Sequence, residues 1–210
     1  QYNNAHYPDV DDTAVVVMAL DRIDPAGNQE AIERGAEWIL GLQSKNGGWG
    51  AFDADNEYYY LNHIPFADHG ALLDPPTADV SARCLGMLAQ LGYKLDDPRV
   101  KAAVDYLLRE QEPEGCWFGR WGTNYIYGTW SVLASLNAIG LPPEHPAMKK
   151  AVQWLESKQR PALQQATHTL VAAGRRQPHL RGQLLVRQPS IIRESCQYAA
   201  IDLVECPGIH

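Results

Sequence analysis

The sequence predicts an all-α fold, an α/α barrel (toroid) built from paired helices, on two observations. An internal repeat recurs along the chain, and its copies carry apolar residues at helical spacing. The helix candidates between the copies are richer in small and aliphatic residues, so buried and half-exposed helices alternate. Such alternation is typical of a double ring of helices, and we expect the barrel to be incomplete in this chain. A plain helical solenoid without a pocket is the alternative.

Three segments share a basic start, an aromatic residue followed by aliphatic residues, and then a glutamine. They read RGAEWILGLQSKNGGWG, ending at Gly50, KAAVDYLLREQEPEGCWFG, ending at Gly119, and KKAVQWLESKQRPALQQ, ending at Gln165. The first two close on Gly-x-Trp, whereas the third does not. The matching positions are Trp38, Gln43, Gly47 and Trp49 in the first copy, Tyr106, Gln111, Gly115 and Trp117 in the second, and Trp154 and Gln159 in the third.

Each copy predicts an amphipathic helix that ends at a glycine, because glycine adopts a left-handed backbone conformation without steric cost. We expect the tryptophan to fold back on the helix end and the glutamine to cap neighbouring backbone groups. Further helices are expected between the copies, over residues 12–21, 78–91 and 128–139. Their composition indicates that they are more buried than the repeat helices.

Composition and charge argue against several classes of protein. The chain has 210 residues and a formal net charge of −7, which argues against a nucleic-acid partner. No apolar run in the sequence approaches the roughly 20 residues of a membrane-spanning helix. The four cysteines lie far apart without metal-ligand spacing, so we expect reduced thiols and neither a disulfide framework nor a metal site; they are Cys84, Cys116, Cys196 and Cys206.

The composition changes near residue 160. All six tryptophans precede it, and the chain up to there carries 22 Asp and Glu against 13 Lys and Arg. After Pro161 the sequence has one aromatic residue, no lysine, five arginines and six glutamines. We therefore predict two parts: residues 1–160 belong to the α/α-barrel domain, and residues 161–210 are an aberrant tail, either frame-shifted or disordered. The chain begins at Gln1, so we expect a fragment or a processed piece.

An acidic cluster stands at the start of the first helix candidate. The segment HYPDVDDTAV places Asp9, Asp11 and Asp12 directly before an apolar stretch. Desolvation and mutual repulsion raise the pKa of carboxyl groups in such a place, so that one of them can keep its proton and act as an acid. The alternative is a helix N-cap cluster, which Asp12 before Thr13 fits well. A magnesium site is a third interpretation, although no basic cradle for a diphosphate is evident in the sequence.

The repeat and several other segments resemble the triterpene cyclase family. Gln-x-x-x-Gly-x-Trp resembles its QW motif, and DVDDTA resembles the Asp-x-Asp-Asp-Thr-Ala motif of squalene–hopene cyclases. The segments WGAFDADN, NHIPFADHG, DPPTADVSAR and GRWGTNYIYGT are also similar, in the same order. The resemblance covers residues 1 to 160. It favours the squalene type over the oxidosqualene cyclases, whose acid motif is shorter.

The resemblance assigns chemistry to the acidic cluster. It implies that Asp11 protonates a terminal alkene, and that Asp9 and Asp12 accept hydrogen bonds and stabilise the charge left on Asp11. It places Asp79 and Arg83 behind the acid, where a basic group would hydrogen-bond Asp11 and stabilise its anion. From spacing alone, Asp79 and Arg83 are a helix-surface pair at i, i+4, worth about 0.3–0.5 kcal/mol. Arginine cannot return a proton as histidine could, so we expect reprotonation through water.

Aromatic residues complete the site that the resemblance implies. Trp121 and Tyr127 would line the cavity near the acid and guide the first rings, and Phe52 would offer a π face without a hydroxyl group. Phe66 would gate the channel that leads to the cavity. From the residues alone, these side chains are equally well read as packed aromatic loops. We expect the tryptophans of the QW motif to be structural.

The resemblance implies a class II terpene cyclase, which performs acid-initiated polycyclisation of squalene to hopene, with water capture giving hopanol, and uses no cofactor. It also implies a peripheral or monotopic protein on the membrane surface, at the cytoplasmic side of the bacterial inner membrane, and a homodimer. We expect no activity from this fragment alone. The alternatives are a related cyclase that acts on another polyprenoid, and a helical-repeat binding module without catalysis.

Overall fold

The computed structural model describes residues 8–64 and 72–158. Every regular element in these residues is a helix, which confirms the predicted all-α class. The chain divides into two units, Gln1–Val152 and Gln153–His210, and the tail predicted over 161–210 lies outside the described residues. The elements are α1 Val10–Ile23, α2 Gln29–Gly41, the 3₁₀ helix η1 Tyr59–His63, α3 Ala78–Gln90, α4 Pro98–Arg109 and α5 Asn124–Ala138, and residues 146–158 are also helical.

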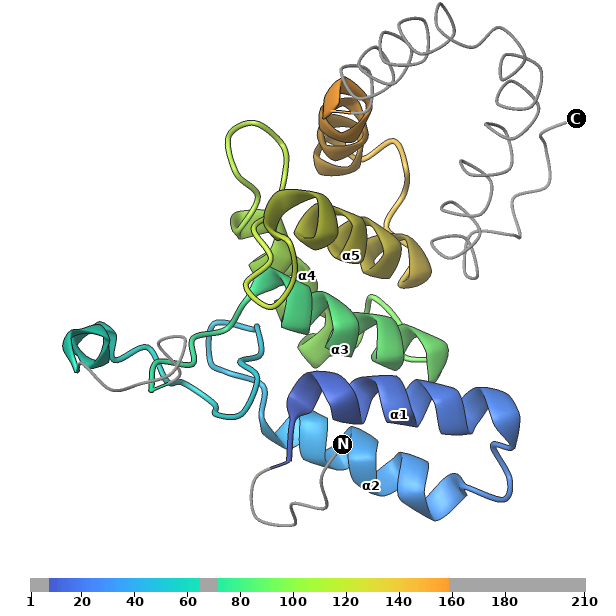
Figure 1. Cartoon of the computed structure of the whole chain (residues 1–210). Helices are drawn as coiled ribbons and strands as arrows, with labels where there is room; N and C mark the ends of the chain where they lie inside the picture. The colour runs from blue at the N-terminus through green and yellow to red at the C-terminus, as the bar shows by residue number, and fades with distance from the viewer. Residues whose placement is uncertain (1–7, 65–71, 159–210) are drawn as a thin grey trace, which may run out of the picture. The chain divides into compact units, whose positions relative to one another are not determined.

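Within the first unit, the helices that alternate with the repeat helices lie side by side (Figure 1). α3 stands in the middle and packs against both α1 and α5. Each repeat helix packs against an intervening helix, α2 against α1 and α4 against α3. The two kinds of helix therefore alternate along the chain and pack against each other in pairs.

The expectation that all three intervening helices are more buried than the repeat helices is wrong for α1. α3 has nine buried residues and α5 has six, but α1 has three, as many as the repeat helix α2. The side chains of Val15 and Val16 on α1 are 41% and 54% exposed. α3 is the most buried helix because it packs against helices on three sides.

In the first two repeats, the glutamine joins its own turn to the repeat helix that follows, whereas Gln159 of the third lies outside the described residues. Gln43 Nε2 donates to the backbone carbonyl oxygens of Gly47 and Arg99, at 2.9 Å each, and Arg99 belongs to α4. The equivalent Gln111 makes the same two bonds, also at 2.9 Å, to its own turn and to the helical stretch that follows. The predicted capping role is therefore confirmed, and the bonds reach beyond the glutamine's own turn to a second helix.

The glycine of each repeat adopts the predicted left-handed conformation, with φ of +96° at Gly47 and +102° at Gly115. A Cβ atom at Gly47 would lie 2.2 Å from the carbonyl oxygen of Ala102 on α4, so the turn can approach that helix only without a side chain. The expectation that these glycines end the helices is wrong, since α2 ends at Gly41 and α4 at Arg109. The glycines lie several residues later, inside the turn.

The tryptophan of each repeat folds back on the preceding helix, as predicted. Trp49 and Trp117 are fully buried, and their indole Nε1 atoms donate to the carbonyl oxygens of Ile39 at 2.7 Å and Leu107 at 2.6 Å. Their backbone N–H groups donate to hydroxyl groups on α3 and α5. Each tryptophan therefore fixes the end of a repeat helix to an intervening helix, Trp49 to α3 and Trp117 to α5.

Candidate active site

The acidic cluster lies at the N-terminus of α1, and Asp9 is the residue that caps the helix. The Asp9 Oδ1 atom accepts the backbone N–H of Asp12 at 2.8 Å, and the Asp9 carbonyl oxygen accepts the hydroxyl of Thr13 at 2.6 Å. The N-cap interpretation is therefore right for the cluster but wrong in choosing Asp12. Partial burial raises the pKa of Asp9, although the hydrogen bond from the Asp12 backbone opposes this effect.

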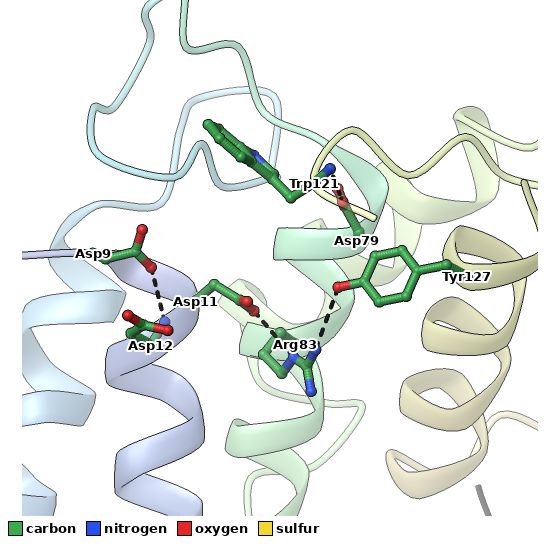
Figure 2. Close-up of polar contacts among 7 residues, drawn as sticks. All are labelled: Asp9, Asp11, Asp12, Asp79, Arg83, Trp121 and Tyr127. Atoms are coloured by element: carbon green, nitrogen blue, oxygen red, sulfur yellow. Dashed lines mark hydrogen bonds and ion pairs between the residues drawn. The ribbon is translucent and has the colours of Figure 1, made fainter. Parts of the chain in front are cut away.

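Asp11 and Arg83 form an ion pair at the centre of the site (Figure 2). Arg83 Nε donates to Asp11 Oδ1 at 3.0 Å, and the side chains are 26% and 31% exposed, respectively. Arg83 Nη2 also donates to the hydroxyl oxygen of Tyr127 at 3.4 Å. These three side chains come from α1, α3 and α5, so the three adjacent helices meet at one polar contact.

Burial and charge act in opposite directions on this ion pair. Desolvation raises the pKa of Asp11, the positive charge and hydrogen bond of Arg83 lower it, and the net result is a pKa above the ordinary value of 3.8. Burial alone would lower the pKa of Arg83, but the negative charge of Asp11 and the contact with Tyr127 outweigh burial and raise it. The site therefore holds a carboxyl group that keeps its proton more readily than a solvated one, next to a permanent cation.

Asp79 is not the surface residue that its spacing to Arg83 suggests. It is 1% exposed, and its Oδ2 atom accepts the backbone N–H of Trp121 at 2.8 Å (Figure 2). Its Oδ1 atom is buried and has no hydrogen-bond partner among the described residues. The interpretation as a helix-surface pair is therefore wrong, because Asp79 holds the loop that carries Trp121 while Arg83 pairs with Asp11.

The aromatic candidates lie in two groups. The Phe52 and Trp121 rings pack edge to face, with centroids 6.3 Å apart and an interplanar angle of 88°, and Trp121 is 43% exposed. The Tyr127 ring instead contacts Trp130 on α5, with centroids 6.4 Å apart. The interpretation of these residues as a packed aromatic loop thus holds in part for Trp121, whose ring contacts Phe52 although much of the residue stays exposed. Phe66, the gate candidate, lies outside the described residues.

Sequence reasoning missed Asp74, which is buried and holds the loop before the site. Its carboxylate accepts three consecutive backbone N–H groups, from Ala51 at 3.0 Å, Phe52 at 2.7 Å and Asp53 at 2.8 Å. The carbonyl oxygen of Ala51 in turn accepts the N–H of Val10 at 2.8 Å. Asp74 therefore connects the Phe52 loop to the start of α1. The feature of the sequence that could have indicated this role is the position of Asp74 immediately before two prolines, where the chain is extended.

Two further features bear on the chemistry. No group of three or more His, Cys, Asp or Glu side chains in the described part of the chain is arranged to hold a metal ion. Among the same residues, no helix has the length and apolar character needed to cross a membrane.

The fold and the site together define an α/α-repeat protein that presents a half-buried carboxylic acid at the shared end of three helices. The family model described as the squalene-hopene cyclase C-terminal domain matches residues 1–163. The chain therefore belongs to the squalene–hopene cyclase family.

Individual relatives agree with this family. The chain is 63% identical over 164 residues to the squalene–hopene cyclase of Zymomonas mobilis, a match that covers 76% of the chain and 25% of the relative. It is 62% identical, with the same coverage, to a probable squalene–hopene cyclase of Sinorhizobium fredii. It is 50% identical over 143 residues to the squalene–hopene cyclase of Alicyclobacillus acidocaldarius, covering 67% of the chain and 23% of that relative. The chain thus spans a quarter or less of the length of these relatives.

Proposed function

We propose that the longer protein to which this chain corresponds catalyses the acid-initiated polycyclisation of squalene to hopene and hopanol. The observation that carries the proposal is the ion pair between Asp11 and Arg83, in which burial nevertheless keeps the pKa of Asp11 above its ordinary value. An alkene is a very weak base, so its protonation needs an acid that is still protonated when the substrate arrives. The family relationship supports squalene as the substrate.

In the proposed reaction, Asp11 donates its proton to the terminal alkene of squalene. A new C–H bond forms from the π electrons, and the positive charge moves to the neighbouring carbon. Each following alkene attacks the cation, forms a C–C bond and passes the charge on. Loss of a proton from the last cation gives hopene, and addition of water followed by loss of a proton gives hopanol. No cofactor takes part in these steps.

Arg83 supports the first step, because its guanidinium stabilises the carboxylate that Asp11 becomes. Arg83 cannot return the proton, since its pKa is raised above an already high value. Water must therefore reprotonate Asp11 before the next turnover. Asp9 and Asp12 contribute through the helix start, where the Asp9 carboxylate accepts the backbone N–H of Asp12, the residue that follows Asp11.

Aromatic faces are suited to the later cations, because they attract positive charge without acting as nucleophiles. Trp121 and Phe52 form one such pair, and Tyr127 lies beside Arg83. Each desolvated cation–π contact is worth about 0.5–2 kcal/mol. Phe66 remains proposed as the gate to the cavity.

A water-insoluble substrate implies a membrane partner. We therefore also propose that the longer protein binds peripherally or monotopically to the cytoplasmic side of the bacterial inner membrane, as a homodimer. Fractionation of cells that express the longer protein, followed by salt and detergent washes, tests the membrane proposal. Size-exclusion chromatography with light scattering in detergent tests the dimer.

The function is tested with the full-length enzyme in detergent-solubilised membranes, fed with squalene and analysed by gas chromatography and mass spectrometry. Asp11→Asn removes the acid, whereas Asp55→Asn is the matched control, because Asp55 is an exposed carboxylate paired with Lys45. We expect pentacyclic products from the parent and the control, and none from Asp11→Asn. Equal product from the parent and Asp11→Asn would assign the proton to another residue. A folded parent that leaves squalene unchanged would direct the search to another polyprenoid.

A further inference from the structure

Arg120 contacts the indole ring of the residue that follows it, Trp121. The guanidinium Cζ atom lies over the ring, 5.3 Å from its centroid, which is within the range of a cation–π contact. The Nη2 atom of the same guanidinium donates to the backbone carbonyl oxygen of Leu73 at 2.9 Å. The guanidinium is thus fixed at one end to the backbone and holds the ring at the other.

The contact connects two parts of the site that are distant in sequence. Leu73 directly precedes Asp74, whose carboxylate holds the backbone N–H of Phe52 at 2.7 Å. The Phe52 ring packs on the Trp121 ring. Arg120 therefore joins the backbone segment that anchors Phe52 to the ring that Phe52 contacts.

We propose that Arg120 is a positioning residue, which fixes the plane of the Trp121 indole and thereby keeps the cyclisation cascade from ending early. This inference rests on the proposed cyclase function. The backbone of Trp121 is held by Asp79, but that bond does not restrict rotation of the side chain. Phe52 contacts the ring, yet 43% of Trp121 stays exposed, so the guanidinium supplies the second fixed contact of the indole.

The plane of the indole matters because the attraction between a cation and an aromatic ring depends on orientation. The ring face is negative and attracts a cation, whereas the ring edge is positive. A ring that rotates between the two offers less stabilisation to a passing carbocation. The next ring closure then slows relative to proton loss, so that the cation gives a proton to water and a partly cyclised product is released.

The chain offers a matched control in the preceding repeat. Arg109 also places its guanidinium over an aromatic ring, that of Tyr106 at 5.9 Å, and its Nη2 atom also donates to a backbone carbonyl oxygen, that of Asn46 at 2.7 Å. The two arginines thus make the same kinds of contact. Arg109 lies at the end of α4, a helix that carries none of the candidate site residues, so its loss reports the structural cost of removing such a contact.

The first experiment measures squalene turnover and product distribution for the full-length enzyme and its Arg120→Gln, Arg120→Lys and Arg109→Gln variants. We expect Arg120→Gln to lower kcat about twofold to thirtyfold, the range of one cation–π contact, and to release mono- to tetracyclic products. Arg120→Lys keeps the charge and should restore part of the parent's product ratio. Arg109→Gln should change the melting temperature at most, with an unaltered product ratio. The same partly cyclised products from Arg109→Gln would overturn the proposal.

A double-variant comparison tests whether Arg120 acts through Trp121. If it does, adding Arg120→Gln to Trp121→Leu changes kcat and products less than adding it to the parent. Effects that simply multiply would overturn the proposal, because Arg120 would then act independently of the ring.

A spectroscopic readout separates this inference from the proposed function. In enzyme labelled with 5-fluorotryptophan, the Trp121 ¹⁹F resonance is identified by its loss in Trp121→Phe. We expect Arg120→Gln to shift or broaden that resonance and Arg109→Gln to leave it unchanged. A parent without activity on squalene would refute the function and leave this test intact. An unaltered Trp121 resonance in Arg120→Gln would refute the positioning role, whatever the parent's activity.

Discussion

Replacing Arg83 by glutamine tests how the ion pair sets the strength of the acid. Arg83 Nε lies 3.0 Å from Asp11 Oδ1, and a hydrogen bond between charged groups typically contributes about 1.5–3 kcal/mol. Because both side chains keep some solvent contact, we take the lower part of this range, about 1.5–2.5 kcal/mol. The carboxylate that remains after proton transfer is destabilised by this amount in Arg83→Gln.

The expected result is a kcat that falls about tenfold to hundredfold, measured as squalene turnover by the full-length enzyme. The pH profile supplies a second readout with a definite sign. The pKa of Asp11 is already above 3.8, and removal of its cation raises it further. The proposed reaction needs protonated Asp11, so the descending limb of kcat at high pH should move to higher pH while the maximum falls.

A lower maximal kcat together with a descending limb at higher pH would indicate a weaker acid. General damage to the fold would lower kcat without moving the limb. Arg83→Lys retains a cation and should lie between the parent and Arg83→Gln, although it lacks the second contact to Tyr127 through Nη2. A limb that stays in place, or that moves to lower pH, would refute the idea that Arg83 stabilises the Asp11 anion.

Two further predictions concern the scaffold. Gly47→Ala should destabilise the full-length enzyme by about 2–5 kcal/mol, since left-handed strain of about 1–2 kcal/mol adds to a backbone clash of about 1–3 kcal/mol. Gly92 also has a left-handed conformation but open space around it, so Gly92→Ala should show the strain alone. Equal losses of stability for the two variants in thermal unfolding would contradict the clash. Asp74→Asn replaces a charged acceptor of three N–H groups and should lower the free energy of unfolding by about 1.5–3 kcal/mol. We expect kcat to fall as well, because the Phe52 loop loosens. Unchanged stability and kcat would show that the loop holds its position without Asp74.

The sequence predicted the repeat turns well because most of their interactions are local. The bond from Gln43 to Gly47 spans four residues, and the left-handed glycine follows from steric rules that hold in any protein. Spacing also placed a cap at the start of α1, but it named Asp12 where Asp9 performs the capping. The error is less than one helical turn, which is within the ordinary uncertainty of helix boundaries.

The missed features depend on contacts between distant segments. The spacing of Asp79 and Arg83 shows that they share a face of α3 but not what covers that face, and the loop that binds Asp79 begins some forty residues later. The role of Asp74 likewise depends on a loop more than twenty residues earlier. Both acids bind backbone N–H groups, which every residue but proline offers, so no residue type in the partner segment could reveal the contact.

The proposed role of Asp11 as an acid requires two opposed influences on its pKa. Burial without a cation would give a carboxyl group that holds its proton too firmly to protonate an alkene. A cation without burial would lower the pKa and leave the group ionised before the substrate arrives. The net shift is upward, so burial dominates before the reaction, while Arg83 is already in place to stabilise the anion that forms. Because α1 supplies the acid and α3 the cation, this balance depends on how closely the two helices pack. The first repeat turn, which binds α3 through Trp49 and leads to Ala51, which binds the start of α1, therefore contributes to acid strength as well as to stability.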